Sequence, residues 1–460
     1  MKRVWILLGL FLSGCSVGPE MTSFFHNERV AFSDLESDIE PTTISMILPL
    51  SGVWATTGDA FQKASLLALD EHPEAPIRLL FFDTQSTIEG TQNAYDMAVT
   101  QKSDIILGPV FADEFKALPS PSLVNKPLLG YTSDNTLLNS ERASFAVLIP
   151  EQVNEIVRQN CLSGKQKMAV IGPEGKTGEI VMNALEKVIP NCPRMTLEKY
   201  ALYDAKKPDM SSDILKILPP VINPKKKDLT EEEQEMLNTP MAERLAFDSL
   251  LVFEDGAKLT QVMSVLAFYD VDPTVIPIYT LASAKFLKDR SLNGVLMTDL
   301  PPNPTFGKKY KKAFGKQPMR LASLAYDSVG WIAAESVRGP VSLKVLREGE
   351  PYQGVDGWVR LKADGTNQRG LRLVRKTSRG VTEVVPAPLE LPEEDASFLP
   401  DWMMASMTEE ESTDSASESP VTLDESPEAL VRSTLDEQLQ PTSVDSAPLL
   451  DNPVDASATP

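Results

Sequence analysis

The chain has 460 residues and a formal net charge of −21 at pH 7, and 42% of its residues are hydrophobic. This length and apolar content allow two or three domains with a sizeable core. Residues 389–460 carry 18 acidic side chains against the single base Arg432, and the preceding part is nearly neutral without a basic, aromatic-rich cluster, which argues against a nucleic-acid partner.

The N-terminus has the pattern of a targeting segment. Lys2 and Arg3 precede an apolar run over residues 4–12 that is too short to span a bilayer. Leu-Ser-Gly-Cys at residues 12–15 matches the bacterial lipobox, in which cleavage leaves Cys15 as a lipidated first residue. We therefore expect residues 1–15 to be a lipoprotein signal peptide and the lipid on Cys15 to anchor the protein in a membrane. Ser16, where inner-membrane lipoproteins place Asp, favours the periplasmic side of the outer membrane.

The next part of the chain alternates between predicted strands and helices. Residues 16–41 are polar and aperiodic, which predicts a tether. Strands are expected at 44–50, 77–82, 105–107, 127–130 and 145–148, and helices at 59–71, 87–101 and 113–118. Asp59 is expected to cap the first helix, with Gln62 completing the cap. Such alternation predicts a parallel sheet with helices on both faces.

The alternation starts again after Pro150. Helices are predicted at 152–160, 178–188 and 257–268, and strands at 167–171, 248–254 and 275–279. A strand within 294–299 and a long helix over 321–337 follow. Two successive half-sheets of this kind predict an α/β fold with two Rossmann-like lobes.

Three further segments stand apart from this alternation. The polar insertion 204–243 contains a lysine run at 225–227 and a capping box that begins at Thr230, which predicts a short, solvated helix. Two alternating runs flank residues 364–367 and predict an antiparallel hairpin. Residues 387–460 are rich in Ser, Pro, Asp and Glu, and we expect this acidic tail to be disordered.

Two cysteines follow Cys15 in the chain. Cys161 and Cys192 each lie between a predicted helix and a predicted strand, and such positions share one end of a doubly wound sheet. A disulfide suits an exported protein, whereas two buried thiols that pack as small apolar groups are the alternative. We favour the disulfide.

Several motifs resemble type I periplasmic binding proteins of the Leu/Ile/Val-binding type. They are ILPLSG at 47–52, LAYDSV at 324–329 and the hairpin after Tyr352. The resemblance implies lobes that are joined by several crossovers, with residues 42–149 and 281–350 in lobe 1 and residues 150–280 and 351–386 in lobe 2. Four segments, 48–52, 106–110, 244–252 and 276–280, resemble penicillin-binding protein activator lipoproteins, which stimulate peptidoglycan synthases at the outer membrane. That closer resemblance implies a bifunctional penicillin-binding protein as partner.

Loops at the carboxyl ends of strands form the ligand cleft in two-lobed α/β proteins. Small residues in such loops let backbone N–H groups approach an anionic ligand, or they serve only as turns. The candidates for a small-molecule site are Ser51, Gly52, Gly108, Pro109, Tyr131, Thr132, Ser133, Glu174, Gly175, Glu254 and Asp255.

Motifs for catalysis are missing from the sequence. No G-x-S-x-G, H-E-x-x-H, C-x-x-C, Walker or dinucleotide motif occurs, and there are only two histidines. We therefore expect a binding protein without catalytic residues, metal ligands or a cofactor.

Two functions stay open at this point. One is a regulator of peptidoglycan synthesis, and the other is a solute-binding lipoprotein that serves an ABC transporter for amino acids or another small molecule. Asp113 lies near the position where amino-acid-binding members hold the ligand carboxylate with Ser or Thr, which favours the regulator. The large helical-repeat domain of the best-known activators, replaced here by residues 16–41, weighs against it.

Overall fold

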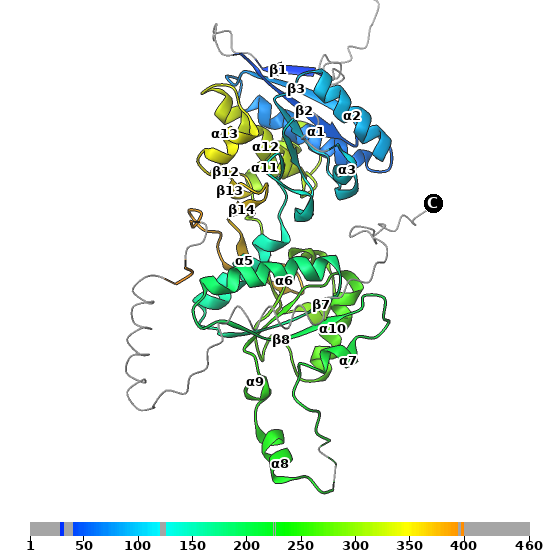
Figure 1. Cartoon of the computed structure of the whole chain (residues 1–460), viewed down its shortest axis with the longest axis vertical. Helices are drawn as coiled ribbons and strands as arrows, with labels where there is room; N and C mark the ends of the chain where they lie inside the picture. Colours follow the sequence, from blue (N-terminus) through cyan, green and yellow to red (C-terminus); the bar gives the residue numbers. More distant parts are fainter. Residues whose placement is uncertain are drawn as a thin grey trace, which may run out of the picture. The chain divides into compact units, whose positions relative to one another are not determined.

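Two large sheets organise the computed structural model, which describes residues 28–31, 40–119, 126–223, 225, 227–393 and 397–399 (Figure 1). The predicted α/β class with two Rossmann-like lobes is confirmed. The lipobox with Cys15 and residues 400–460 lie outside the described part. Among the described residues, no helix combines the length and the apolar character that crossing a bilayer requires.

The first sheet has the strand order β1-β3-β2-β4-β5-β6. Strands β2 to β6 are parallel, whereas β1 pairs antiparallel with β3. Their bounds are β1 (Glu28–Ala31), β2 (Thr42–Leu48), β3 (Ile77–Asp83), β4 (Ile105–Leu107), β5 (Leu128–Gly130) and β6 (Arg142–Ser144). Because β1 falls within 16–41, the prediction that this whole segment is a tether is wrong.

Helices cover both faces of this sheet. On one face lie α1 (Ala55–Asp70), α11 (Pro304–Phe314) and α12 (Ala322–Ser336), and on the other α2 (Ile88–Thr100) and α3 (Ala112–Ala117). Strand β2 serves both cores, because Met46 and Leu48 face the first group and Ile47 faces the second. A short helix, α13 (Leu343–Glu348), completes the lobe.

Helix α1 corrects the predicted cap. The helix begins four residues before Asp59, after Trp54, which makes no side-chain cap. Asp59 lies inside the helix and instead binds Lys63 and Lys316. Phe61 and Ala64 lie on the buried face whether the helix starts at Ala55 or at Asp59. The apolar periodicity alone therefore did not determine where the helix begins.

The second sheet has the order β16-β15-β11-β10-β9-β7-β8, with β7 to β11 parallel and the last two strands antiparallel at one edge. The strands are β7 (Lys167–Pro173), β8 (Thr196–Tyr203), β9 (Ser249–Val252), β10 (Ile278–Thr280), β11 (Leu296–Asp299), β15 (Arg372–Thr377) and β16 (Gly380–Val385). Helices α7 (Ser211–Ile214) and α10 (Gly256–Phe268) share one core with this sheet. Helices α5 (Ile149–Leu162) and α6 (Lys176–Val188) pack against each other and contact β11 and β7.

The two parallel sheets follow one plan. In each of them the second strand of the βα series lies outside the first, and the third, fourth and fifth strands follow on the other side. This 2-1-3-4-5 order places a topological switch point between β2 and β4 in the first lobe and between β7 and β9 in the second.

Part of the predicted lobe assignment differs from the sheet topology. Strand β11 lies within 281–350, the range assigned to lobe 1, but it pairs with β10 and β15 of the second sheet. Conversely, β12 (Tyr352–Gly354), β13 (Gly357–Leu361) and β14 (Asn367–Arg369), assigned to lobe 2, form a small third sheet that packs with the first lobe. The Tyr352 ring stacks on Trp331 of α12 at 5.7 Å between ring centroids. Asn367 donates hydrogen bonds to the carbonyls of Ser144, the last residue of β6, and Ala146.

The insertion and the first residues of the acidic tail also have defined structure. In the insertion between β8 and β9, which extends away from the second sheet in Figure 1, Thr230 and Glu233 form the predicted capping box of α8 (Glu231–Asn238). Another short helix, α9 (Met241–Arg244), follows. The start of the predicted disordered tail is held on the small sheet, because Trp358 donates to the carbonyl of Leu389 at 2.6 Å. The prediction of disorder from residue 387 is therefore wrong for its first residues.

Candidate functional site

The sequence-predicted candidates lie at the carboxyl edges of the two parallel sheets. The loops after β2 and β4 flank the switch point of the first sheet, and the loops after β7 and β9 flank that of the second. Such edges are where open α/β sheets bind ligands. These loops hold Ser51, Gly52, Gly108 and Pro109 in the first lobe, and Glu174, Gly175, Glu254 and Asp255 in the second.

Asp83, which the sequence reasoning missed, occupies the hydrogen-bond donors of the loop after β2. Its carboxylate accepts from the backbone N–H groups of Leu50 at 2.9 Å and Ser51 at 3.0 Å, and from the Ser51 hydroxyl at 2.6 Å. It also accepts from the N–H of Gln85 at 2.7 Å. Burial raises the pKa of Asp83, but the hydrogen bonds from Ser51, Gln85 and Leu50 outweigh it and leave the pKa below its usual value. The sequence feature that could have identified Asp83 is an acidic residue at the end of the apolar strand β3.

Gly52 and Gly108 take backbone conformations that suit glycine. Their φ angles are +81° and +97°, and a Cβ at Gly108 would lie 2.3 Å from the carbonyl oxygen of Ile47. The peptide bond between Gly108 and Pro109 is cis. For both glycines, the structure therefore shows a backbone reason for the residue type, independent of any ligand.

Aromatic side chains lie beside these two loops. Trp54 packs on Phe111 with 4.9 Å between ring centroids, and the Trp54 residue is 40% exposed. Its neighbour Val53 is 85% exposed. The carboxyl edge of the first sheet thus presents apolar surface next to the backbone that Asp83 holds.

A buried acid follows in α3. Glu114 is 5% exposed, and its carboxyl group accepts a hydrogen bond from the Thr84 hydroxyl at 3.4 Å. Its Oε2 atom has no hydrogen-bond partner among the described residues. Burial raises the pKa of Glu114 to about 7. Asp113, the acid that the sequence analysis had noticed, is exposed, so the neighbouring residue is the buried one.

The three candidate residues after β5 differ in how far their side chains are exposed to solvent. Tyr131 is buried, and its hydroxyl pairs with the Ser328 hydroxyl at 2.8 Å, so it is part of the core. Thr132 is also buried, whereas Ser133 is exposed. Of this trio, only Ser133 presents its side chain to solvent.

The second lobe contributes an acidic edge. Glu254 is half-buried and accepts a hydrogen bond from the Tyr203 hydroxyl, and burial raises the pKa of its carboxyl group. The N–H of Asp255 donates a hydrogen bond to the Glu254 carboxylate at 3.1 Å. Asp255 is exposed and is the N-cap residue of α10. Glu174 is exposed, and Gly175 has a φ of +90° at the start of α6.

Metal ligands do not gather anywhere in the part of the chain that the structure covers. No three His, Cys, Asp or Glu side chains come close enough there to hold an ion. The candidate edges therefore offer acids, hydroxyls, aromatic rings and backbone donors as the groups that contact a ligand or a partner.

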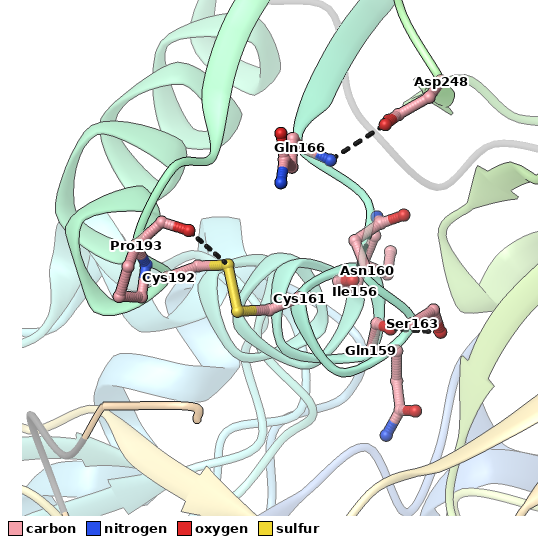
Figure 2. Close-up of a disulfide and its surroundings, with 9 residues drawn as sticks. All are labelled: Ile156, Gln159, Asn160, Cys161, Ser163, Gln166, Cys192, Pro193 and Asp248. Atoms are coloured by element: carbon pink, nitrogen blue, oxygen red, sulfur yellow. Dashed lines mark hydrogen bonds between the residues drawn. A yellow bond between two sulfur atoms is a disulfide. The ribbon is translucent and has the colours of Figure 1, made fainter. Parts of the chain in front are cut away.

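Cys161 and Cys192 form a disulfide in the second lobe (Figure 2). Cys161 belongs to the last turn of α5, and Cys192 follows a short 3₁₀ turn after α6. The two Cα atoms lie 5.8 Å apart, and both residues are 4% exposed. The bridge therefore ties together the ends of two helices that pack side by side.

Comparisons with known proteins agree with this architecture. A family model described as periplasmic binding protein matches residues 41–380. No curated protein matches the sequence.

The chain is also similar to solved structures of binding proteins. A putative branched-chain amino acid ABC transporter protein from Rhodospirillum rubrum has a TM-score of 0.58 at 17% identity, over 75% of this chain and 100% of the other. A branched-chain amino acid transporter ligand-binding protein from Burkholderia xenovorans has a TM-score of 0.57 at 16% identity, over 78% and 97%. A leucine-binding protein from Thermotoga maritima has a TM-score of 0.50 at 16% identity, over 75% and 99%. At these identities the similarity concerns the fold.

Proposed function

The chain belongs to the periplasmic binding protein family, and from that membership we propose that it regulates peptidoglycan synthesis by binding a penicillin-binding protein. The family is generally non-enzymatic and implies a place in the periplasm or the cell envelope. In the proposal, lipid on Cys15 holds the protein on the periplasmic side of the outer membrane.

The Asp83 carboxylate is the observation that favours a protein partner over an amino-acid ligand. In the loop after β2, Asp83 already accepts the N–H groups and the hydroxyl that would otherwise hold an anionic ligand group. A ligand carboxylate would displace Asp83 or lie next to it. Two like charges at about 4 Å repel by about 1 kcal/mol in water and about 4 kcal/mol near a protein surface.

The sequence segments that resemble activator lipoproteins point the same way. Two of them, 244–252 and 276–280, contain β9 and β10 of the second lobe, and β9 borders the switch point there. The exposed apolar side chains of Val53 and Trp54 provide surface that a protein partner can cover.

A solute-binding protein of an ABC transporter is the second candidate. Its support is the partly exposed Trp54 beside Phe111 at the carboxyl edge of the first sheet, together with the similar solved structures, which are proteins described for branched-chain amino acids and leucine. A solute without a carboxylate suits the Asp83 loop better than an amino acid does.

A paired experiment separates the two functions. The full-length protein serves as bait in detergent-solubilised envelope, with an unrelated lipoprotein as the control bait, and the same protein is screened by thermal shift against amino acids and amines. We expect a peptidoglycan synthase to be recovered only with this bait, and no ligand to raise the melting temperature. Stabilisation by one solute without recovery of a synthase would establish the second candidate instead, since a saturating ligand stabilises by RT ln(1 + [L]/Kd).

A further inference from the structure

Helix α11 carries an unusual concentration of positive charge. Residues 300–326 contain five lysines and Arg320 but no Asp or Glu, in a chain whose net charge is −21. The helix begins after Asn303, whose side chain accepts from the N–H of Phe306, and ends at Gly315 in the left-handed conformation. The buried rings of Phe306 and Tyr310 fix one face in the core. The lysines consequently lie on the solvent face.

Three of these lysines have no acidic partner among the residues that the structure describes. Lys309 pairs with Glu71 at 2.6 Å, and Lys316 pairs with Asp59 at 2.9 Å, so α11 runs antiparallel to α1. In the described part of the chain, the remaining lysines of the helix are exposed and make no ion pair: they are Lys308, Lys311 and Lys312. The acids on α1 and the turn after it are Asp59, Asp70, Glu71 and Glu74.

A groove lies between the two helices on this basic surface. It has a volume of about 620 Å³ and is lined by Leu67, Glu71, Lys309, Lys312 and Ala313. Leu67 and Ala313 are the apolar residues of its lining. Its charged residues are the Lys309–Glu71 ion pair and the unpaired Lys312. Apolar and cationic groups in one groove suit a ligand that joins an anionic head to an apolar body.

We propose that the basic surface of α11 binds the phosphodiester headgroups of anionic phospholipids in the membrane that holds the Cys15 lipid. This rests on the anchor in the proposed function. Twelve residues separate Cys15 from β1, which is hydrogen-bonded to the edge of the first sheet. A segment of that length reaches about 40 Å at most, so the first lobe stays close to the headgroups and its lysines meet them at high local concentration.

The overall negative charge does not prevent this contact. Charges more than a Debye length away, about 8 Å at physiological salt, are largely screened, so the local surface decides the interaction. Each lysine near an anionic membrane surface strengthens binding by about fivefold. Three unpaired lysines therefore account for a factor of about one hundred.

Vesicle sedimentation tests the proposal without the anchor. The chain from residue 15 onward, with Cys15→Ser, is mixed with vesicles containing about 30% phosphatidylglycerol or with neutral phosphatidylcholine vesicles. We expect binding to the anionic vesicles alone, lost at about 0.5 M salt. The variant Lys308→Gln/Lys311→Gln/Lys312→Gln should bind about a hundredfold more weakly. A matched variant, Lys225→Gln/Lys226→Gln/Lys227→Gln, removes three lysines from the second lobe and should bind normally.

Several outcomes would overturn the inference. Equal binding by the two triple variants, or binding to neutral vesicles, would place the contact elsewhere. Binding of an acidic peptide or of inorganic phosphate to α11, without any binding to vesicles, would assign the surface to another anion. Because the assayed chain carries no lipid, a failed anchor would appear only in cell fractionation and would not alter this result. Equal melting temperatures of the variants show that the fold is retained.

Discussion

At the scale of single residues, the loop after β2 depends on one carboxylate. Asp83 is the common acceptor for Leu50, Ser51 and Gln85, so it holds two loops of the first lobe together. No other side chain in these hydrogen bonds is charged. Its replacement tests whether the loops are held from within the protein.

We predict that Asp83→Asn lowers the free energy of unfolding by about 1 kcal/mol at neutral pH, because the amide accepts fewer hydrogen bonds and the site is partly solvated. The folded-state pKa of Asp83 is depressed, so its contribution is present above the unfolded value of about 4 and disappears as the pH falls through the folded value. Urea titrations of both proteins at several pH values measure this. A difference that persists in strong acid would contradict the assignment.

A buried charge cluster in the first lobe has the opposite pH dependence. Asp327 and Asp356 are each 1% exposed, and the Arg369 guanidinium lies over the Phe145 ring. Burial raises the pKa of Asp327, and the charge of Asp356 raises it further. The folded state therefore holds a proton that the unfolded state has lost above about pH 4. This contribution to stability falls as the pH rises towards the folded pKa.

We expect Arg369→Met to destabilise the protein by about 3 kcal/mol, since it removes the buried hydrogen bond to the Phe145 carbonyl and the positive charge that acts on Asp327 and Asp356. Arg320, which pairs with Asp356 at 2.8 Å, remains as a cation of the cluster. Chemical denaturation measures the loss. Arg375→Met is the matched control, because Arg375 is exposed on β15. If both variants lost the same stability, the buried cluster would not be the reason.

At the scale of elements, the disulfide joins α5 to the turn after α6. It closes a loop with a sequence separation of 31 residues. Opening a loop of that size costs about 4 kcal/mol of stability through the freedom gained by the unfolded chain. We predict this loss for Cys161→Ala/Cys192→Ala, measured by denaturation without reductant. In the wild type, reductant should cause a comparable loss, and two alkylatable thiols in the unreduced, denatured protein would refute the bridge.

Local patterns predicted the elements that depend on local interactions. The hairpin of β13 and β14 follows from the turn residues 364–367 and pairs Leu361 with Asn367. The capping box at Thr230 likewise needs only four neighbouring residues. The start of α1 was misplaced because Asp59 suits a cap in isolation, whereas the structure uses it to bind Lys63 and Lys316.

At the scale of the whole molecule, long-range pairing decided what the sequence did not predict. The sequence of β11 does not distinguish it from other short strands of the chain. Only its pairing with β10 and β15 shows that it belongs to the second lobe. The candidate site shows the same limit. The loop residues Ser51 and Gly108 were found from their place after strands, but Asp83 and Glu114 matter through contacts with segments 30 or more residues away.

The final prediction concerns the attachment of the protein to the envelope. Lys2, Arg3, the apolar run 4–12 and Cys15 have the spacing of a lipoprotein signal, so we expect the mature chain to be held by lipid on Cys15. Cys15→Ala removes the acceptor of the lipid and should move the protein from the membrane fraction to the soluble envelope fraction. Fractionation after a high-salt wash measures this, because the wash also removes protein that is held only by the lysines of α11. Retention of Cys15→Ala in the washed membranes would refute the lipid anchor.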